Sequence, residues 1–229
     1  MTVLATRPDA LPGLLRRITG DEKHAPSAHS TLDVLWVLYD RILRVTPETV
    51  NAPDRDRFLL SKGHGPAAYY AVLAAKGFLP VEWLDHTGEW DSPLGWHPDR
   101  VLIPGVEIGT GSLGHGLGLA VGTALGLRAQ GFAEARTFVL LGDAELDEGS
   151  NFEGIAYVAA TRLPLTAIVI DNQSATHGWP GGIASRFTVN GWAASTVDGR
   201  DHDALEVALR ERVPGRPNVV VAVVESKWS

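Results

Sequence analysis

The chain contains no cysteine among its 229 residues. It therefore cannot form a disulfide, hold a metal through thiolates or use a cysteine nucleophile. It also lacks an apolar run of the roughly 18 residues that a membrane-spanning helix needs. The apolar stretch LPGLL near the start is short and flanked by charge, which does not fit a secretory signal. We expect a soluble, cytoplasmic protein that makes no membrane contact.

Clusters of basic residues are missing as well, and the formal net charge is −7. Without such clusters the chain has no basic surface to bind the phosphates of nucleic acid, so we do not expect nucleic acid as a partner. Hydrophobic residues make up 45% of the chain and charged residues 21%, which is typical of a soluble globular protein. A chain of this length can form one α/β domain with a sizeable core.

The first half of the sequence has few regular patterns. Residues 1–20 read as a flexible lead-in that ends in a short basic helix, LLRRIT. Apolar residues at helical spacing predict a helix over 31–44, with Ser30 or Thr31 as its N-cap. Residues 79–110 are rich in Pro, Gly and Trp, which indicates an extended loop with short helical pieces.

The second half alternates between helices and short apolar strands. Helices are predicted over 66–76, 113–130, 150–161 and 204–212, and strands over 137–141, 165–170 and 218–224. Gly77 would close the first of these helices, and Ser150 would cap the third. This order predicts an α/β fold with a doubly wound, mostly parallel sheet and helices on both faces. Ligands of such sheets bind beyond the carboxyl ends of the strands.

Polar residues follow two of the predicted strands. Asp143 and Asn172 are 29 residues apart (172 − 143), which is one strand–helix–strand step. A right-handed crossover would place both at the same edge of the sheet. Their oxygens are hard donors that suit Mg²⁺ or Ca²⁺, and the helix that begins at Ser150 offers its N-terminus to an anion. The structural alternative is that Asp143 caps a helix and Asn172 forms a turn.

The residues around this pair resemble the thiamine diphosphate signature, in which GDG is followed by Asn. The segment GDAELDEG from Gly142 is similar to the transketolase pattern GDG-x-L-x-E-G. Three further segments occur in the family's order: SKGHG from Ser61, GWHP from Gly95 and TGSLGHG from Thr110. The chain thus resembles the N-terminal, diphosphate-binding subunits of split transketolases. The resemblance implies that 1–229 is a single domain with the thiamine-diphosphate-binding fold.

The resemblance also implies a metal site and a surface for the cofactor. Mg²⁺, with Ca²⁺ as a substitute, would be ligated by the side chains of Asp143 and Asn172 and the backbone carbonyl of Ser174. The residues that would line the bound thiamine diphosphate are Gly111, Leu113, Gly114, Gly142, Ala144, Asn172 and Gly178. Among these, Leu113 would pack near the thiazolium ring.

Four residues would act in catalysis if the resemblance holds. His64 would approach the diphosphate and the substrate, and His97 would face the reacting two-carbon unit. His24 would be the family's first histidine, because it lies nine residues before Asp33, although it lacks the family's flanking glycines. Glu148 would lie at a subunit interface. Histidine suits such a site because its pKa lies near neutrality.

The sequence departs from the family pattern in several places. Ala144 replaces the last glycine of GDG and fits only with a negative φ. His177 replaces an acidic residue. The family continues beyond the position of Ser229, and its pyrimidine-binding domain, with the glutamate that activates the cofactor, has no counterpart in this sequence. We therefore expect a partner chain that supplies this domain, in a two-plus-two heterotetramer.

Several functions remain open. The resemblance implies transfer of a two-carbon ketol unit from a ketose phosphate, with activity only in the presence of the partner. A carbon–carbon ligase or decarboxylase that acts on 2-keto acids is an alternative. The G-x-G-x-x-G pattern at 109–114 would also fit an NAD-dependent dehydrogenase, although 106–108 is a poor strand. The last alternative is a non-catalytic scaffold protein.

Overall fold

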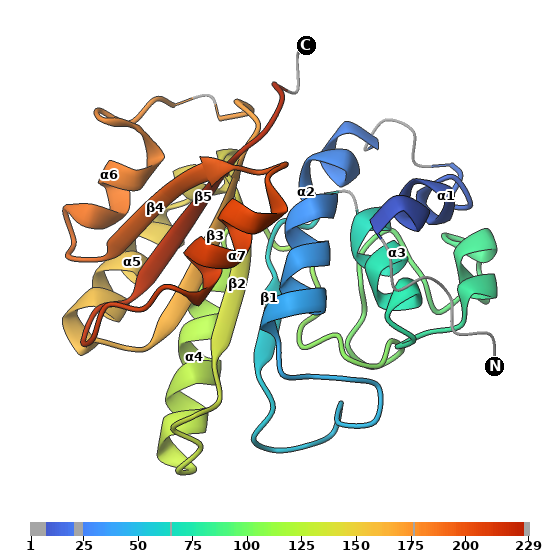
Figure 1. The fold of residues 1–229 in the computed structure, drawn as a ribbon, viewed down its shortest axis with the longest axis horizontal. Helices are drawn as coiled ribbons and strands as arrows, with labels where there is room; N and C mark the ends of the chain where they lie inside the picture. The colour runs from blue at the N-terminus through green and yellow to red at the C-terminus, as the bar shows by residue number, and fades with distance from the viewer. Residues whose placement is uncertain (1–7, 21–24, 65, 176, 227–229) are drawn as a thin grey trace.

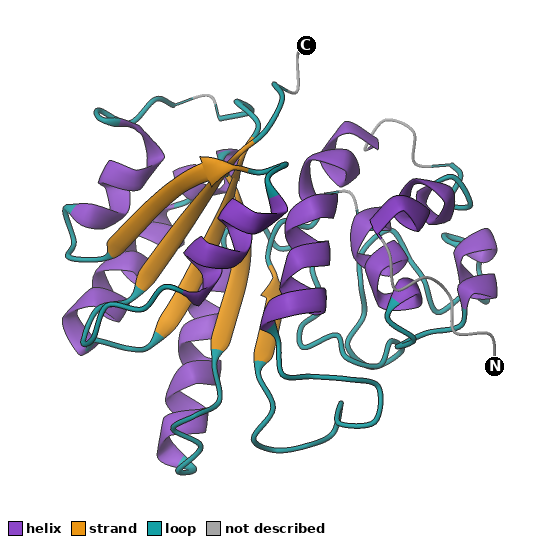
Figure 2. Ribbon diagram, in the orientation of Figure 1, coloured by secondary structure: helices purple, strands orange, loops and turns teal. Residues whose placement is uncertain are grey.

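The computed structural model describes residues 8–20, 25–64, 66–175 and 177–226, and its centre is one parallel sheet. The strands run in the order β1-β2-β3-β5-β4, and every neighbouring pair is parallel (Figures 1 and 2). Their bounds are Arg57–Leu60 (β1), Thr137–Gly142 (β2), Leu165–Asp171 (β3), Ala193–Asp198 (β4) and Asn218–Val223 (β5).

Helices cover both faces of this sheet. The α-helices are α1 (Leu11–Leu15), α2 (Ala25–Val37), α3 (Ala67–Ala75), α4 (Gly116–Ala129), α5 (Gly149–Thr161), α6 (Gly182–Thr188) and α7 (His202–Arg210). A π-helical turn, Leu38–Ile42, continues α2, and 3-10 turns occupy Pro8–Ala10, Val81–His86 and Ala144–Asp147. The doubly wound α/β prediction is confirmed.

Alternate strand residues enter two separate apolar cores, because successive side chains of a strand point to opposite faces. In β2, Phe138 and Leu140 pack with α1, α2, α3 and α7, whereas Val139 and Leu141 pack with α4 and α5. Strands buried on both faces read as continuous apolar runs. This property made β2, β3 and β5 recognisable in the sequence.

The structure corrects several predicted elements. The predicted helix 31–44 begins six residues earlier, at Ala25, so Ser30 and Thr31 lie inside α2 and do not cap it. Their hydroxyls donate to the carbonyl of Ser27 at 2.8 Å. The sequence analysis did not predict β1, β4 or α6, whereas the loop over 79–110 with a short helical piece is confirmed.

Part of the predicted flexible lead-in belongs to the core. Residues 1–7 lie outside the described part of the chain, but Leu11, Leu14 and Leu15 are buried in the core that also contains α3. The short helix therefore starts before the LLRRIT segment, because its leucines, and not its arginines, decide its position.

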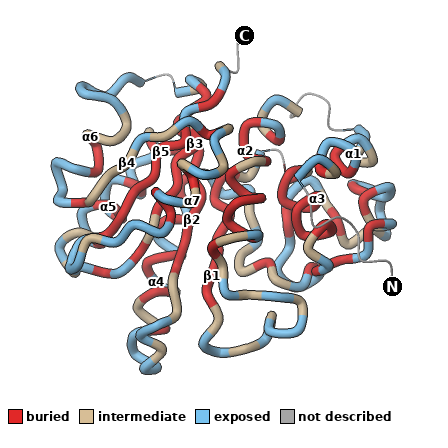
Figure 3. Tube along the Cα trace, viewed as in Figure 1, coloured by how far each residue is buried: buried red, intermediate tan, exposed pale blue. Residues whose placement is uncertain are grey.

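The helices α3 and α4 differ in how they are covered. In α3 every residue from Ala68 to Ala75 is buried (Figure 3). In α4 the buried residues alternate with exposed ones, and the exposed residues include Gly118, Leu119 and Gly122. No helix in the described ranges is long and apolar enough to cross a membrane.

Candidate functional site

The strands β2 and β3 bring Asp143 and Asn172 to the same sheet edge. Gly142 is in register with Ile170, and the backbone N–H of Asp143 donates to the Ile170 carbonyl at 3.1 Å. Both polar residues are almost fully buried, with 2% and 3% of their surface exposed. The parallel crossover predicted from their spacing is thus present.

The carboxylate of Asp143 organises the loop that follows β3. It accepts hydrogen bonds from the backbone N–H of Ser174 at 2.6 Å and of Ala175 at 3.2 Å, and from the Ser174 hydroxyl. Gln173 adopts a left-handed backbone (φ 57°), which turns the chain back toward Asp143. The third predicted metal-site residue, Ser174, therefore contacts the first.

The side-chain oxygen of Asn172 is buried and has no hydrogen-bond donor. An unsatisfied buried acceptor typically costs about 1–3 kcal/mol, so a native structure needs a reason for it. A cation is such a reason, because amide and carboxylate oxygens are the ligands that Mg²⁺ and Ca²⁺ prefer. In the described residues, no three His, Asp or Glu side chains form a metal site. The donor set of Asp143, Asn172 and a backbone carbonyl does not depend on such a cluster, and it fits a hard divalent cation.

His97 lies between two glycine backbones. A Cβ atom added to Gly63 would come within 3.3 Å of the His97 ring, and one added to Gly111 would do the same. Thr110 places its hydroxyl 3.4 Å from Nδ1 of His97. Gly63, Thr110 and Gly111, from two other motifs, therefore meet around the exposed imidazole of His97, and the glycines leave room for its ring.

Lys62 carries a buried positive charge beside this cluster. Its aliphatic stem passes 3.5–3.8 Å from the position of a Cβ added to Gly142. Its ammonium group donates to the carbonyl and hydroxyl of Ser27 at 2.9 and 2.6 Å, and to the hydroxyls of Ser30 and Thr31 at 3.3 and 3.0 Å. The N-terminal part of α2 is thus held against the end of β2.

A buried carboxylate, Glu145, lies two residues after Asp143. Burial raises the pKa of Glu145 above its usual value, although hydrogen bonds from Ser61 and two backbone N–H groups and the nearby Lys62 ammonium oppose this effect. No sequence motif marked Ser61, Lys62 or Glu145 as functional residues. No local signal sets Glu145 apart, because Asp143, Asp147 and Glu148 beside it are acidic as well.

The remaining predicted residues lie around the same edge. Leu113 is exposed, and Gly114 is buried against Glu148, whose Cβ would lie 2.6 Å from a Cβ added to that glycine. Ser150 was predicted to cap α5, but it does not. Its hydroxyl donates to the carbonyl of Gly114 at 2.6 Å, and Glu148 occupies the N-cap position without a side-chain bond.

Other predicted residues are near the site without forming its centre. Ala144 meets the condition of a negative φ, because the described non-glycine residues with positive φ are Arg162 and Gln173. Gly178 is exposed with open space around it. His177 places Nδ1 3.2 Å from the carboxylate of Asp147.

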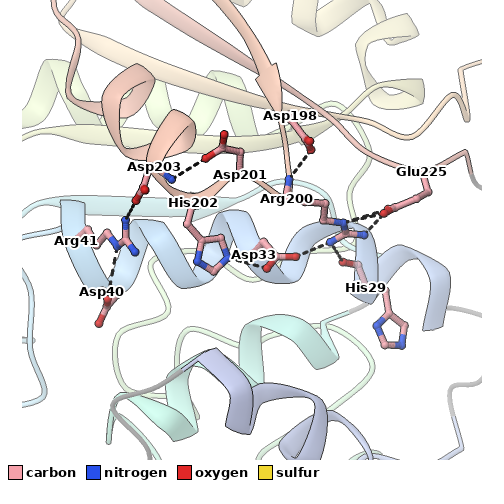
Figure 4. A network of polar contacts seen from close by, with 10 residues as sticks. All are labelled: His29, Asp33, Asp40, Arg41, Asp198, Arg200, Asp201, His202, Asp203 and Glu225. Carbon is pink, nitrogen blue, oxygen red and sulfur yellow. Dashed lines mark hydrogen bonds and ion pairs between the residues drawn. The ribbon is translucent and has the colours of Figure 1, made fainter.

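Of the two predicted histidines near α2, the structure describes only His64. His64 is exposed, and its carbonyl accepts a hydrogen bond from the Ser27 hydroxyl at 3.0 Å. His24 lies outside the described residues. Asp33, which the sequence analysis paired with His24, accepts hydrogen bonds from Arg200 at 2.6 Å and His202 at 2.8 Å (Figure 4). This network ties α2 to the loop after β4 and to the first residue of α7.

The backbone around the G-x-G-x-x-G pattern at 109–114 does not fit a dinucleotide-binding site. That motif requires a strand immediately before the glycine-rich turn, but residues 106–108 form no strand. The glycines of this segment serve instead to bring its backbone close to His97 and Glu148.

Comparisons with known proteins point to one family. The family model described as "Transketolase, thiamine diphosphate binding domain" matches residues 19–223. The chain is 35% identical over 207 residues to an apulose-4-phosphate transketolase subunit of Actinobacillus succinogenes, covering 87% of this chain and 75% of that protein. It is similar to a transketolase structure from Pichia stipitis, with a TM-score of 0.74 and 29% identity, over 86% of this chain and 36% of that one.

A relative with higher identity carries a different kind of name. A protein of Rhodococcoides fascians called ferredoxin fas2 is 56% identical over 217 residues, which cover 94% of this chain and 71% of that protein. The present chain has no cysteine. It therefore cannot hold an iron–sulfur cluster through thiolates, and the name of that relative does not describe the chemistry of this domain.

Proposed function

The chain belongs to the transketolase family through its thiamine diphosphate-binding domain, and on that premise we propose that it is the cofactor-binding half of a two-chain, transketolase-like transferase. The observation that carries this proposal is the pairing of Asp143 with the unsatisfied oxygen of Asn172 at adjacent strand ends. The chain spans about a third of the Pichia stipitis transketolase, so the activity of the whole enzyme is part of the proposal.

Asp143, Asn172 and the carbonyl of Ser174 would hold Mg²⁺, or Ca²⁺ in its place, and through it the diphosphate. The surface around the diphosphate would come from Gly142, Ala144 and Gly178, and Gly111, Leu113 and Gly114 would lie toward the ring end of the cofactor. Thiamine diphosphate, when bound, supplies the electron sink for breaking and forming a carbon–carbon bond.

The protein groups would position the substrate and move protons. His97 is exposed at the meeting point of three segments, and an imidazole can donate or accept a proton near neutral pH. His64 would act beside it, and His24 would be the family's first catalytic histidine. Glu148, at the start of α5, would contact the partner.

The partner would be a pyrimidine-binding subunit that contributes the activating glutamate. The Actinobacillus succinogenes relative is named as one subunit of its transketolase, which supports a second chain, and so does the surface of exposed glycine and apolar residues on α4 and α5 of the present one. We name this surface the α4–α5 face, and it consists of Gly118, Leu119, Gly122, Phe152 and Tyr157. Two copies of each chain in a heterotetramer would cover it, with the assembly acting in the cytoplasm.

The substrate would be a ketose phosphate that donates a two-carbon ketol unit. This choice follows the name of the apulose-4-phosphate transketolase relative. An assay of the reconstituted pair with ketose phosphates and with simple 2-keto acids tests it. Turnover confined to 2-keto acids would replace the sugar-phosphate reaction with the ligase or decarboxylase reaction.

Two variants test the division of roles within the site. In the complex with its partner, Asp143→Ala should lose Mg²⁺-dependent binding of thiamine diphosphate, measured by calorimetry. His97→Ala should bind the cofactor like the unmodified chain and turn over about 10²–10⁴-fold more slowly, which is the usual contribution of a positioned acid or base. Equal loss of cofactor affinity in both variants would contradict the assignment, and turnover by this chain alone would contradict the need for a partner.

A further inference from the structure

The carboxylate of Glu145 is the meeting point of three separate segments. Glu145 lies in the 3-10 turn after Asp143 and has 2% of its surface exposed. One carboxylate oxygen accepts hydrogen bonds from the Ser61 hydroxyl and from the backbone N–H of Gly114 at 3.1 Å. The other oxygen accepts from the backbone N–H of Gly142 at 3.2 Å.

Each donor belongs to a different part of the candidate site. Ser61 begins the SKGHG segment after β1, Gly114 lies in the loop before α4, and Gly142 ends β2. The network extends further, because the Ser61 hydroxyl also accepts from the N–H of Gly116 at 3.1 Å. The Glu145 side chain thus connects to two loops whose residues Gly114 and Ser61 lie 31 and 84 residues before it in the sequence.

The packing around these contacts leaves little freedom. A Cβ atom on Gly116 would come within 2.2 Å of the Ser61 side chain, and one on Gly114 within 2.6 Å of Glu148. Gly114 also has a left-handed φ of 79°, which glycine adopts at low cost. The N–H of Gly114 can approach Glu145, and that of Gly116 can approach Ser61, only because these two positions have no side chain. The distances between the loops are therefore tightly set.

A carboxylate fits this position better than any neutral side chain. All of its partners are donors, and an ionised carboxylate is the side chain that only accepts. A glutamine has the same shape, but its NH₂ group would face a backbone N–H or a hydroxyl donor. At least one buried donor would then lose its acceptor.

We propose that Glu145 is a positioning residue that fixes the three loops at the spacing needed to receive thiamine diphosphate. This inference rests on the proposed function. Glu145 does not contact the reacting atoms; it acts through Gly142, Gly114 and the Ser61 segment. Its contribution is preorganisation, which lowers the cost of ordering the site when the cofactor binds.

The test compares Glu145→Gln with Glu82→Gln in the complex with the partner chain. Glu82 is exposed in a 3-10 turn, so it is a control for the same chemical change outside the site. Calorimetry at saturating Mg²⁺ gives the dissociation constant of thiamine diphosphate, and thermal unfolding gives the melting temperature. We expect the Glu145 variant to bind the cofactor at least about tenfold more weakly, as the loss of a buried hydrogen bond implies, with kcat at saturating cofactor within about threefold of the unmodified enzyme.

A second variant keeps the test decisive if Glu145→Gln does not fold. Ser61→Ala removes one donor and keeps the carboxylate, so it should weaken cofactor binding in the same direction and to a smaller extent. In the double variant the two effects should not add, because they disrupt one network.

Two outcomes, different from those expected, would overturn the inference. A lower melting temperature with unchanged cofactor affinity in the folded variants would make Glu145 only structural. A fall in kcat at saturating cofactor without a change in affinity would place it in the chemical step. If the unmodified complex bound no thiamine diphosphate at all, the proposed function itself would fail, and that result is distinct from unchanged affinity in the variants.

Discussion

The helices α3 and α4 have similar compositions but different surroundings. Both consist mainly of small and apolar residues, AAYYAVLAA in α3 and GLGLAVGTALGLRA in α4. α3 is enclosed by α1, α2 and the turn after it, and it is buried from Ala68 to Ala75. α4 covers one face of the sheet, but Leu119 on its outer side is 48% exposed.

This difference shows that an apolar composition predicts that a helix is buried, but does not tell which part of the protein, or which partner, covers it. The neighbouring helix α5 also carries exposed aromatic residues, Phe152 and Tyr157, which are 42% and 47% exposed. Exposed large apolar side chains on neighbouring helices are a feature of interaction sites. α3 obtains its cover from its own chain, whereas we propose that α4 obtains it from the partner chain.

The largest effect is expected for a charge placed in α3. Ala71 is fully buried, and Ala71→Glu would bury a carboxylate without a partner. Such a group costs several kcal/mol, which is comparable to the whole stability of about 5–15 kcal/mol of a typical domain. Circular dichroism of the purified chain should show loss of the cooperative unfolding transition. A variant that unfolds like the parent would mean that α3 can open to solvent.

The same charge in α4 should act on assembly and leave folding intact. A Cβ on Gly122 would have open space around it, so Gly122→Glu should keep the circular dichroism spectrum of the isolated chain. It should abolish co-purification with the partner chain, because the carboxylate would be buried in the interface. Gln130→Glu, at the exposed end of the same helix, is the control. Normal assembly of the Gly122 variant would exclude this part of the α4–α5 face from the interface.

The smallest effect is expected for alanine at the same position. Gly122→Ala should stabilise the isolated chain by about 1 kcal/mol, the usual difference between alanine and glycine inside a helix. Thermal unfolding should show a rise of roughly 2–4 °C. Ala74→Gly in α3 should produce a change of opposite sign. Destabilisation by Gly122→Ala in the absence of the partner would show that α4 is already crowded within its own chain.

The sequence predicted those parts of the fold that depend on local patterns. The strands β2, β3 and β5 are apolar runs buried on both faces, and their ends located Asp143 and Asn172. The strand β1 is only four residues long, and the burial of β4, AASTVD, is only partial. Neither segment has a local signal strong enough to separate it from a loop.

The candidate site was predictable where strand ends or contiguous motifs mark its residues. The placement of Asp143 and Asn172 at adjacent strand ends follows from the strand pattern, and the histidine segments follow from the resemblance. The role of Glu145 could not be predicted, because its hydrogen-bond partner Ser61 lies 84 residues away in the sequence. Ser150 was assigned to the wrong partner for the same reason. Its hydroxyl reaches across to Gly114, and only the tertiary structure brings that carbonyl within range.

The position of β4 has a consequence for handling the protein. Among the described strands, β4 ends the sheet and pairs with β5 alone, and its residues are partly exposed. β1, at the opposite end, is buried along its whole length. An exposed edge strand offers unpaired backbone groups to other molecules and is a starting point for aggregation. In concentrated solutions of this chain, intermolecular strand pairing should begin at β4, and storage conditions should be chosen to protect that edge.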